Sequence, residues 1–281
     1  MPELHPRLSI VIVTYNSTRH IPACLDALVH QPPPMRHEIV VVDNASPDGT
    51  ASAIRARWPG VRVIDAGANL GFARANNIGM RESSGGLILL LNPDATATCD
   101  AVAALVAALD ARLDAAIAGP RIVDASGRVE LSFGAMLSPL AECRQKILVR
   151  GNERGWRLVA TYVRALTSRP RDVDWVSGAC LLVRRADAEA VGFMDERYFM
   201  YAEDVDFCAA VRARHRRVIF VPTAEVVHLR GQSRATAATA AAAAYRRSHL
   251  AFYEKHHPRW APLLRLYLKV RGELPDSPIT E

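Results

Sequence analysis

Two adjacent acids, Glu203 and Asp204, have the chemistry of a general base that could remove a proton from a hydroxyl group. Aromatic residues and a methionine lie at 198–201, so an apolar wall is expected beside the acids. They begin a predicted helix, whose N-terminus favours ionised carboxylates, and plain helix capping is the alternative role. Their side chains diverge by about 100° around the helix, so the pair cannot flank one bond as in a glycoside hydrolase.

Asp94 follows Asn92 and Pro93 at the end of a continuous apolar run at residues 87–91. A carboxylate at the end of a strand can hold Mg²⁺ or Mn²⁺, which prefer oxygen ligands and bridge substrate phosphates. His228 follows another short apolar run and could add an imidazole ligand of the kind that Mn²⁺ accepts. A single carboxylate is a weak metal site, and an ordinary surface or core role for the histidine is the alternative.

Two further polar sites could bind a nucleotide. Asp43 follows the apolar run at 38–42, and its carboxylate could accept a hydrogen bond from a nucleobase N–H group. The alternative is an Asx turn or helix cap, a role that fits Asp48 better. Gly71 permits close backbone approach, and the helix that it begins could offer N–H groups to a phosphate or ribose. A simple turn and cap explains that segment equally well.

The elements that would position these residues alternate along the first 120 residues. Apolar runs predict strands at 8–13, 38–42, 61–64 and 87–91, with helices at 21–29, 51–58, 71–83 and 101–112. This order is typical of an α/β fold with a mostly parallel, Rossmann-like central sheet flanked by helices. Ligands in such folds bind beyond the carboxyl ends of the strands, where the polar sites of this half would meet.

The rest of the chain is less regular. A turn at 124–127 predicts a hairpin, 135–170 predicts an insertion with amphipathic helices, and 173–183 predicts a strand interrupted at Gly178 and Ala179. A helix is expected at 202–214, short strands at 218–221 and 225–228, and helical structure from residue 235 onward.

Composition narrows the class of protein. The 281 residues are 50% hydrophobic and 23% charged, which excludes a mainly disordered chain. The five cysteines lack C-x-x-C spacing and have apolar neighbours, so buried free thiols in a reducing compartment are expected. Residues 1–7 lack the order of a signal peptide, and the longest alanine-rich stretches do not suit a bilayer span, so a cytoplasmic protein is expected.

The net charge of +6 is concentrated near the C-terminus. Residues 205–281 contain 13 Lys or Arg and six Asp or Glu, whereas residues 1–204 contain 22 and 23. Such a tail fits an anionic partner or a solvated basic face, and nucleic acid is disfavoured because the strand-end acids would repel its phosphates. Basic residues mix with aromatic and aliphatic ones at 245–253 and 260–269, so a helix at an anionic membrane and a helix packed on the catalytic domain both remain open.

Seven motifs, in sequence order, resemble one family. They are Thr14-Tyr15-Asn16, 41–50 (VVDNASPDGT), 69–77 (NLGFARANN), 91–94 (LNPD), 175–179 (WVSGA), 199–206 (FMYAEDVD) and 228–233 (HLRGQS). The set spans residues 8–233 and resembles a family 2 inverting glycosyltransferase, in particular the bacterial rhamnosyltransferases that act on lipid-linked glycans. Asn92 stands where the family's D-x-D metal motif has its first acid, a departure that bears on metal affinity.

The resemblance implies the GT-A fold, with a nucleotide-sugar-binding half at residues 1–120, an acceptor and catalytic half at 121–234, and a basic helical extension at 235–281. It makes Asp204 the catalytic base and places a Mg²⁺ or Mn²⁺ ion at Asp94 and His228. Its nucleotide-sugar-binding positions are Thr14, Tyr15, Asn16, Asp43, Asn69, Gly71, Phe72, Asn77, Asn92 and Asp94. Its acceptor-side positions are Trp175, Gly178, Ala179 and Glu203.

The activity implied is transfer of L-rhamnose from dTDP-L-rhamnose to a hydroxyl of a glycan or polyprenyl-diphosphate-linked saccharide, in the synthesis of cell-surface or cell wall polysaccharide. A UDP-hexose donor and a catalytically inactive scaffold that binds sugar nucleotides are the alternatives. A nicotinamide-dependent oxidoreductase is disfavoured, because the glycines around residue 71 do not match the dinucleotide-binding fingerprint. The acceptor class implies a cytoplasmic enzyme that associates peripherally with the inner face of the membrane.

Overall fold

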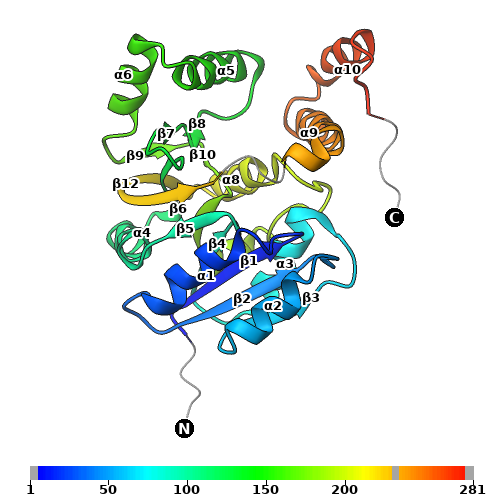
Figure 1. The fold of residues 1–281 in the computed structure, drawn as a ribbon. Coiled ribbons are helices and arrows are strands. Elements are labelled where there is room, and N and C mark those ends of the chain that lie inside the picture. Colours follow the sequence, from blue (N-terminus) through cyan, green and yellow to red (C-terminus); the bar gives the residue numbers. More distant parts are fainter. Residues whose placement is uncertain (1–5, 230–233, 276–281) are drawn as a thin grey trace.

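A ten-stranded sheet crosses the molecule, with helices packed on both of its faces (Figure 1). The computed structural model describes residues 6–229 and 234–275. Along the main path the strands follow the order β3-β2-β1-β4-β11-β6-β12-β5. The sheet is mixed, since β11 runs antiparallel to both β4 and β6.

The first part of the chain forms the parallel side of the sheet, as its alternating apolar runs predict. Each predicted strand and helix in this part is present, with ends within about two residues of the prediction. The elements are β1 (Leu8–Thr14), α1 (Ile21–His30), β2 (His37–Asp43), α2 (Thr50–Arg57), β3 (Arg62–Asp65), α3 (Gly71–Glu82), β4 (Leu87–Leu91), β5 (Ala95–Ala97) and α4 (Cys99–Ala111).

The second part adds the strands that close the sheet and the helices beyond it. Its strands are β6 (Ala115–Val123), β7 (Val129–Glu130), β8 (Phe133–Gly134), β9 (Arg171–Val173), β10 (Trp175–Val176), β11 (Cys180–Arg184) and β12 (Arg217–His228). Its helices are α5 (Pro139–Glu153), α6 (Arg157–Leu166), α7 (Arg185–Ala190), α8 (Glu203–Ala213), α9 (Arg234–His256) and α10 (Ala261–Val270).

Two strand predictions in this part were wrong in detail. The segment 173–183 is not one interrupted strand, because β9, β10 and β11 each pair with different neighbours. The short strands expected at 218–221 and 225–228 are a single strand, β12, whose register against β6 shifts between Val221 and Glu225. Pro222 lies in that shift, where its missing N–H costs the ladder no hydrogen bond.

Strand residues alternate between two apolar cores, one on each face of the sheet. Ile10 and Ile12 of β1 face the core formed with α1 and α4, whereas Val11 faces the core formed with α3 and α8. This alternation explains why β1 and β4 read as uninterrupted apolar runs, since a strand covered on both faces has no solvent side. Cys24, Cys180 and Cys208 are buried free thiols as expected, but Cys143 is exposed and Cys99 is half-buried.

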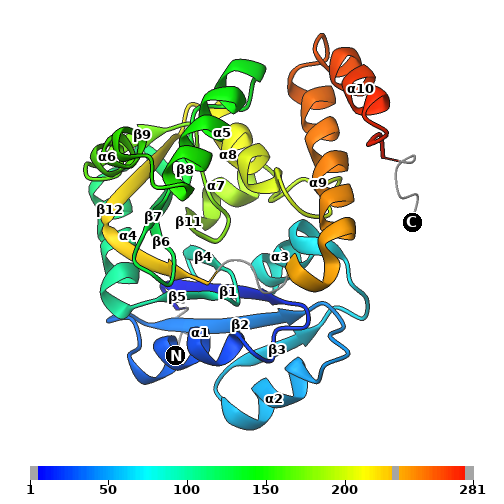
Figure 2. The ribbon, with the colours of Figure 1, turned by 45° about the horizontal axis from the view of Figure 1, so that its top comes forward.

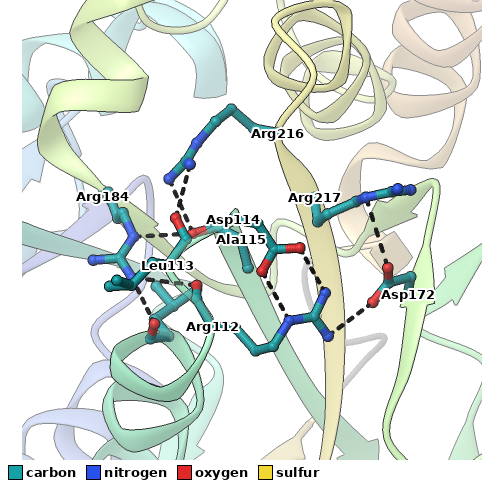
Figure 3. A network of polar contacts seen from close by, with 9 residues as sticks. Arg112, Leu113, Asp114, Ala115, Asp172, Arg184, Arg216 and Arg217 are labelled. Atoms are coloured by element: carbon teal, nitrogen blue, oxygen red, sulfur yellow. Dashed lines mark hydrogen bonds and ion pairs between the residues drawn. The ribbon is translucent and has the colours of Figure 1, made fainter.

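An arginine-rich network ties together the end of the sheet where β6 and β12 begin (Figure 3). Arg112 makes two 2.9 Å hydrogen bonds to Asp114 and a third, at 3.3 Å, to Asp172. Arg184, from the end of β11, donates to the carbonyl oxygen of Ala115 at 2.9 Å. His228 lies at the opposite end of β12. The network therefore stabilises the end of the sheet that is far from His228 and, among the described residues, has no direct contact with the candidate site residues there.

The C-terminal helices pack on the remainder of the protein (Figure 2). Phe252 and Tyr253 of α9 are buried in a cluster with Tyr198 and Val205, which flank the two adjacent acids. Ala261 of α10 joins the same cluster. Within the described ranges, no helix is both long and apolar enough to cross a membrane.

Candidate active site

Asp43 and Thr14 lie side by side at the carboxyl ends of β2 and β1. The Thr14 hydroxyl donates to Asp43 Oδ1 at 2.8 Å, and Ser46 donates from Oγ at 2.6 Å and from its N–H at 2.9 Å. Asp43 therefore organises the turn that follows β2, although a turn role is expected at Asp48 more than at Asp43. Asp48 makes a similar turn with Thr50. A nucleobase contact for Asp43 stays a prediction.

Tyr15 and Asn16 continue from β1 into the loop above this edge. Tyr15 is exposed, with 46% of its surface accessible, so its ring is available to a ligand. Asn16 adopts a left-handed backbone conformation, with φ of 52°, and its N–H donates to Ser46 Oγ at 3.0 Å. The two turns that follow β1 and β2 are thus bonded to each other.

Gly71 brings the start of α3 against the loop that carries the aromatic residues before Asp204. Its φ is +81°, and a Cβ atom at this position would overlap the carbonyl oxygen of Phe199. The N–H of Phe72 donates to that oxygen at 2.6 Å, and the N–H of Gly71 donates to Asn69 Oδ1 at 3.2 Å. The close approach predicted at Gly71 is therefore to protein backbone, and these two N–H groups already have partners.

Two asparagines fix this arrangement through the backbone. Asn44 donates from Nδ2 to the carbonyl oxygen of Gly71 at 3.1 Å and accepts from the N–H of Leu70 at 3.3 Å. Asn77, predicted to bind the nucleotide sugar, is fully buried and bonds both backbone groups of Met194. Any effect of Asn77 on a ligand would therefore pass through the 194–196 loop.

Asp94 and His228 are in direct contact, as the metal-site hypothesis requires. His228 Nε2 lies 3.2 Å from Asp94 Oδ1 because β12 pairs with β5 at the residue after Asp94. Burial by itself would raise the pKa of Asp94, but the hydrogen bond and charge of His228 outweigh it and lower that pKa. Glu130 Oε2 lies 3.9 Å from His228 Nδ1, within the range of an ion pair but too far for a hydrogen bond.

Asp94 and His228 are in contact at this edge, and no cluster of three or more His, Cys, Asp or Glu residues suited to a metal occurs among the described residues. Asn92 supplies a further oxygen nearby in sequence. Its Oδ1 is buried and has no hydrogen-bond partner in the described part of the chain. A carboxylate, an imidazole and an unsatisfied amide oxygen fit an Mn²⁺-like ion, whose remaining ligands a diphosphate would provide.

Asp204 is oriented by two backbone N–H groups. Gly178 donates to Oδ2 and Val205 to Oδ1, each at 2.8 Å. Burial raises the pKa of Asp204 although these hydrogen bonds oppose the rise, so the carboxylate is a stronger base than an exposed aspartate. Phe72 and Gly178 pack closely enough that a Cβ on Gly178 would lie 3.4 Å from the phenylalanine ring and 3.2 Å from Asp204 Cβ.

Glu203 is 5% exposed, and its Oε2 has no hydrogen-bond partner within the described ranges. Burial, followed by repulsion from Asp204, raises its pKa well above the usual value. Desolvation at Glu203 opposes the stabilisation of ionised carboxylates that the helix N-terminus provides. The pair therefore combines a buried acid whose pKa is raised, Glu203, with a carboxylate oriented by two backbone N–H groups, Asp204.

Residues 178 and 179 form hydrogen bonds with both the proposed base and Asn92. While the N–H of Gly178 binds Asp204, the carbonyl oxygen of Ala179 accepts from the N–H of Asn92 at 2.9 Å. Trp175, the other acceptor-side candidate, is half-buried and donates from Nε1 to the carbonyl oxygen of Ala135 at 2.9 Å. The structure thus brings Asp204 and Asn92 to the two sides of one short backbone segment.

A buried acid on α8, Asp206, lies two residues after the proposed base, and nothing in the sequence indicated its partners. Asp206 is 1% exposed and accepts from Lys255 Nζ at 2.8 Å and from Tyr198 Oη at 3.2 Å, while His256 Nε2 lies 2.6 Å from it. Ser248, also on α9, donates to the carbonyl oxygen of Met200 at 2.8 Å. Helix α9 is therefore part of the structure that positions Asp204, although its sequence carried no signal of that contact.

The base and the metal-site candidates lie apart from a hollow of about 460 Å³ that Arg212, His215 and Arg217 help to line. That hollow is at the other end of α8 from Asp204. Its basic lining carries none of the predicted site residues.

Comparison with known proteins decides the family. The family model described as "Glycosyl transferase family 2" matches residues 9–192, which include the strand-end acids, Gly178 and Ala179. The chain belongs to glycosyl transferase family 2. An N-acetylglucosaminyl-diphospho-decaprenol L-rhamnosyltransferase of Mycobacterium tuberculosis is 33% identical, covering 96% of this chain and 95% of that relative. A low-salt glycan biosynthesis hexosyltransferase of Haloferax volcanii is 26% identical, covering 79% and 66%.

Solved structures give this family 2 glycosyltransferase its fold. A mannosyltransferase from Pyrobaculum calidifontis, solved with GDP-Man and Mn²⁺, has a TM-score of 0.61 at 22% identity, covering 94% of this chain and 69% of that one. The GT-A fold implied by the motifs is confirmed, and so is the rhamnosyltransferase-like resemblance. The protein is a glycosyltransferase, and its catalytic residues are proposed below.

Proposed function

We propose that this glycosyltransferase moves L-rhamnose from dTDP-L-rhamnose, with inversion, to a hydroxyl of a lipid-linked saccharide in cell-surface polysaccharide synthesis. The observation that carries the proposal is the geometry at Asp204, a single carboxylate whose two oxygens are each oriented by a backbone N–H group. The sugar and the acceptor class follow the printed name of the mycobacterial relative, which matches the chain over nearly its full length.

A single displacement needs only one base. Asp204 takes the proton of the acceptor hydroxyl as its oxygen attacks the anomeric carbon, and the bond to the nucleoside diphosphate breaks on the opposite face. The N–H groups of Gly178 and Val205 occupy one lone pair on each carboxylate oxygen and fix the direction of the others. Burial raises the pKa of Glu203, which disfavours a second negative charge beside Asp204.

Asp94 and His228 are proposed to hold the divalent ion, with Asn92 Oδ1 as a further oxygen donor. A bound Mg²⁺ or Mn²⁺ would supply the positive charge that stabilises the leaving diphosphate. The imidazole favours Mn²⁺ over Mg²⁺, because Mg²⁺ prefers an all-oxygen shell. At the same edge, Thr14, Tyr15 and Asp43 are proposed to contact the nucleotide.

Asp204→Asn tests the proposed base directly. The variant keeps the shape of the side chain, so transfer should be lost while titration calorimetry still shows binding of dTDP-L-rhamnose. Asp100→Asn, an exposed acid in the first turn of α4, is the matched control and should behave like the parent. Loss of nucleotide-sugar binding in Asp204→Asn would show that the residue is structural.

The donor is tested by a thermal-shift series with dTDP, UDP and GDP sugars in the presence of Mg²⁺ or Mn²⁺. We expect dTDP-L-rhamnose to give the largest rise in melting temperature. A larger rise with a UDP-hexose would favour the alternative donor. Binding without any release of nucleoside diphosphate would favour the inactive scaffold, which Asn92 in place of an acid makes a specific alternative.

A lipid-linked acceptor also bears on where in the cell the enzyme acts. We propose that the protein is cytoplasmic and associates peripherally with the inner face of the cell membrane, where such an acceptor resides. Its binding to vesicles is the corresponding measurement.

A further inference from the structure

Exposed apolar side chains gather at one end of the molecule. Fifteen large hydrophobic side chains are exposed among the described residues, and eleven of them belong to two segments, 139–166 and 260–274. The first contains α5 and α6, called here the α5–α6 hairpin, and the second contains α10. Both views show these helices at the same end, the top in Figure 1, although about 100 residues separate them in sequence.

Helix α10 carries a continuous exposed apolar stripe. Its residues recur at i, i+3, i+4 and i+7, which places them on one face of the helix. Ala261 and Leu268, on the opposite face, are buried. The stripe consists of Leu263, Leu266, Tyr267 and Val270, and Val270 is 80% exposed. Burial within the protein therefore accounts for one face of α10 and leaves the other apolar face uncovered.

The α5–α6 hairpin repeats this pattern. Leu158 of α6 is 88% exposed and Tyr162, one turn later, is also exposed, while Val163 on the other face is buried. Trp156, at the start of α6, and Leu140 and Ile147 of α5 are exposed as well. Two separate parts of the chain thus present amphipathic helices outward at the same end.

The net charge of both segments is positive. Residues 139–169 contain seven Lys or Arg and two Asp or Glu, and residues 257–275 contain four and one. Glu142, one of the few acids, is buried and bonded inside the protein. The side chains of Arg154, Arg157 and Arg164 form no ion pair within the described part of the chain. These three arginines lie beside the α6 stripe, whereas at α10 Arg265 pairs with Glu254 and Arg271 with Glu273. Apolar stripes beside a net positive charge suit a partner surface that is both apolar and anionic.

We propose that the α5–α6 hairpin and α10 together form a docking face for an anionic lipid bilayer. Exposed leucine, tyrosine and tryptophan side chains enter the interface while the arginines contact lipid headgroups. The proposal rests on the proposed function only in that a lipid-linked acceptor places the enzyme at a membrane. It goes beyond a basic C-terminal tail, because it requires α6, whose chain position is far from that tail.

Vesicle sedimentation of the full chain tests this face, using equal parts of phosphatidylglycerol and phosphatidylcholine against phosphatidylcholine alone. Leu158→Glu interrupts the α6 stripe and Leu266→Glu the α10 stripe. Leu113→Glu is the matched control, since Leu113 is 76% exposed in the connection between α4 and β6. Each stripe variant should lower the partition coefficient for anionic vesicles by roughly tenfold, a change equivalent to ~1.4 kcal/mol, and the control should not.

A second readout reports α5 itself. Cys143 is the exposed cysteine on α5, so an environment-sensitive fluorophore attached there should shift to the blue on anionic vesicles and not on neutral ones. Transfer to a short water-soluble acceptor should be the same in both stripe variants and the parent, which separates membrane docking from catalysis.

Three outcomes would overturn the proposal. Parent-like vesicle binding by Leu158→Glu would show that α6 takes no part in membrane docking. Equal binding of the parent to anionic and neutral vesicles would show that the arginines do not contribute to it. Concentration-dependent self-association of the parent in analytical ultracentrifugation, lost in Leu266→Glu, would identify a second copy of the chain as the occupant of this face.

Discussion

Glu142→Gln tests whether the C-terminal helices belong to the catalytic unit. Glu142 of α5 is 7% exposed and accepts from Tyr253 Oη at 2.6 Å, and His249 Nε2 lies 2.9 Å from the same carboxylate oxygen. Both partners are on α9, the helix that also bonds Asp206 behind the proposed base. The carboxylate therefore couples the insertion, the tail and the catalytic loop.

The size of this coupling follows from the pKa of Glu142. Burial by itself would raise that pKa, but the hydrogen bonds and charges of His249, Tyr253 and Lys146 lower it from 4.5 to about 2. At ~1.4 kcal/mol per pH unit, the difference corresponds to about 3 kcal/mol of unfolding free energy. Because the pKa is lower in the folded protein, this contribution is complete at neutral pH. It is lost as the pH falls from about 4.5 towards about 2.

Urea unfolding measures the effect. Glu142→Gln should lower the unfolding free energy by about 2–3 kcal/mol at pH 7, and the deficit relative to the parent should fall to less than half of that at about pH 3. Glu153→Gln, at an exposed position near the end of the same helix, should change little at either pH. A deficit that is absent at pH 7, or that does not change with pH, would refute the reasoning.

Three other substitutions probe the site. Gly71→Ala should cost more than about 2 kcal/mol in urea unfolding, because its φ is +81° and the new Cβ overlaps Phe199, and a smaller loss would contradict that packing. Gly178→Ala places a Cβ 3.2 Å from Asp204 Cβ, so kcat should fall roughly tenfold with nucleotide-sugar affinity unchanged, and a parent-like kcat would count against this geometry. Glu203→Gln should raise stability at pH 8 but not at pH 4, since a raised pKa in the folded state penalises folding once the unfolded carboxyl ionises. Equal effects at both pH values would show that Glu203 is ionised in the folded protein.

The fold of the first half was predictable because its signals are local. A strand buried on both faces must be apolar throughout, and residues 8–13 and 87–91 show that pattern plainly. The pairing of strands in the second half is not local. Three short strands arise from 171–184 because each meets a different neighbour, and no periodicity within the segment identifies those neighbours.

The candidate site was predictable at the level of residues but not of their partners. The contact between Asp94 and His228 follows from strand ends meeting at one edge of a sheet. The proton state of Glu203 does not follow from its position in a helix, because it depends on how completely the fold removes water. Likewise, Lys255 lies 49 residues from Asp206, and only the packing of α9 brings the two together.

The basic C-terminal segment therefore divides into two parts with different roles. Helix α9 faces inward, where Lys255 neutralises the buried Asp206 and Phe252 fills the cluster beside the catalytic loop. Helix α10 faces outward along its apolar stripe. Deleting residues 235–281 would remove both at once, since it takes Lys255 and His256 away from Asp206 and Phe252 out of the cluster with Tyr198. Loss of activity after such a truncation would therefore follow from the lost contacts between α9 and the catalytic loop. Single substitutions on α6 and α10 leave those contacts intact, so they measure the contribution of membrane binding alone.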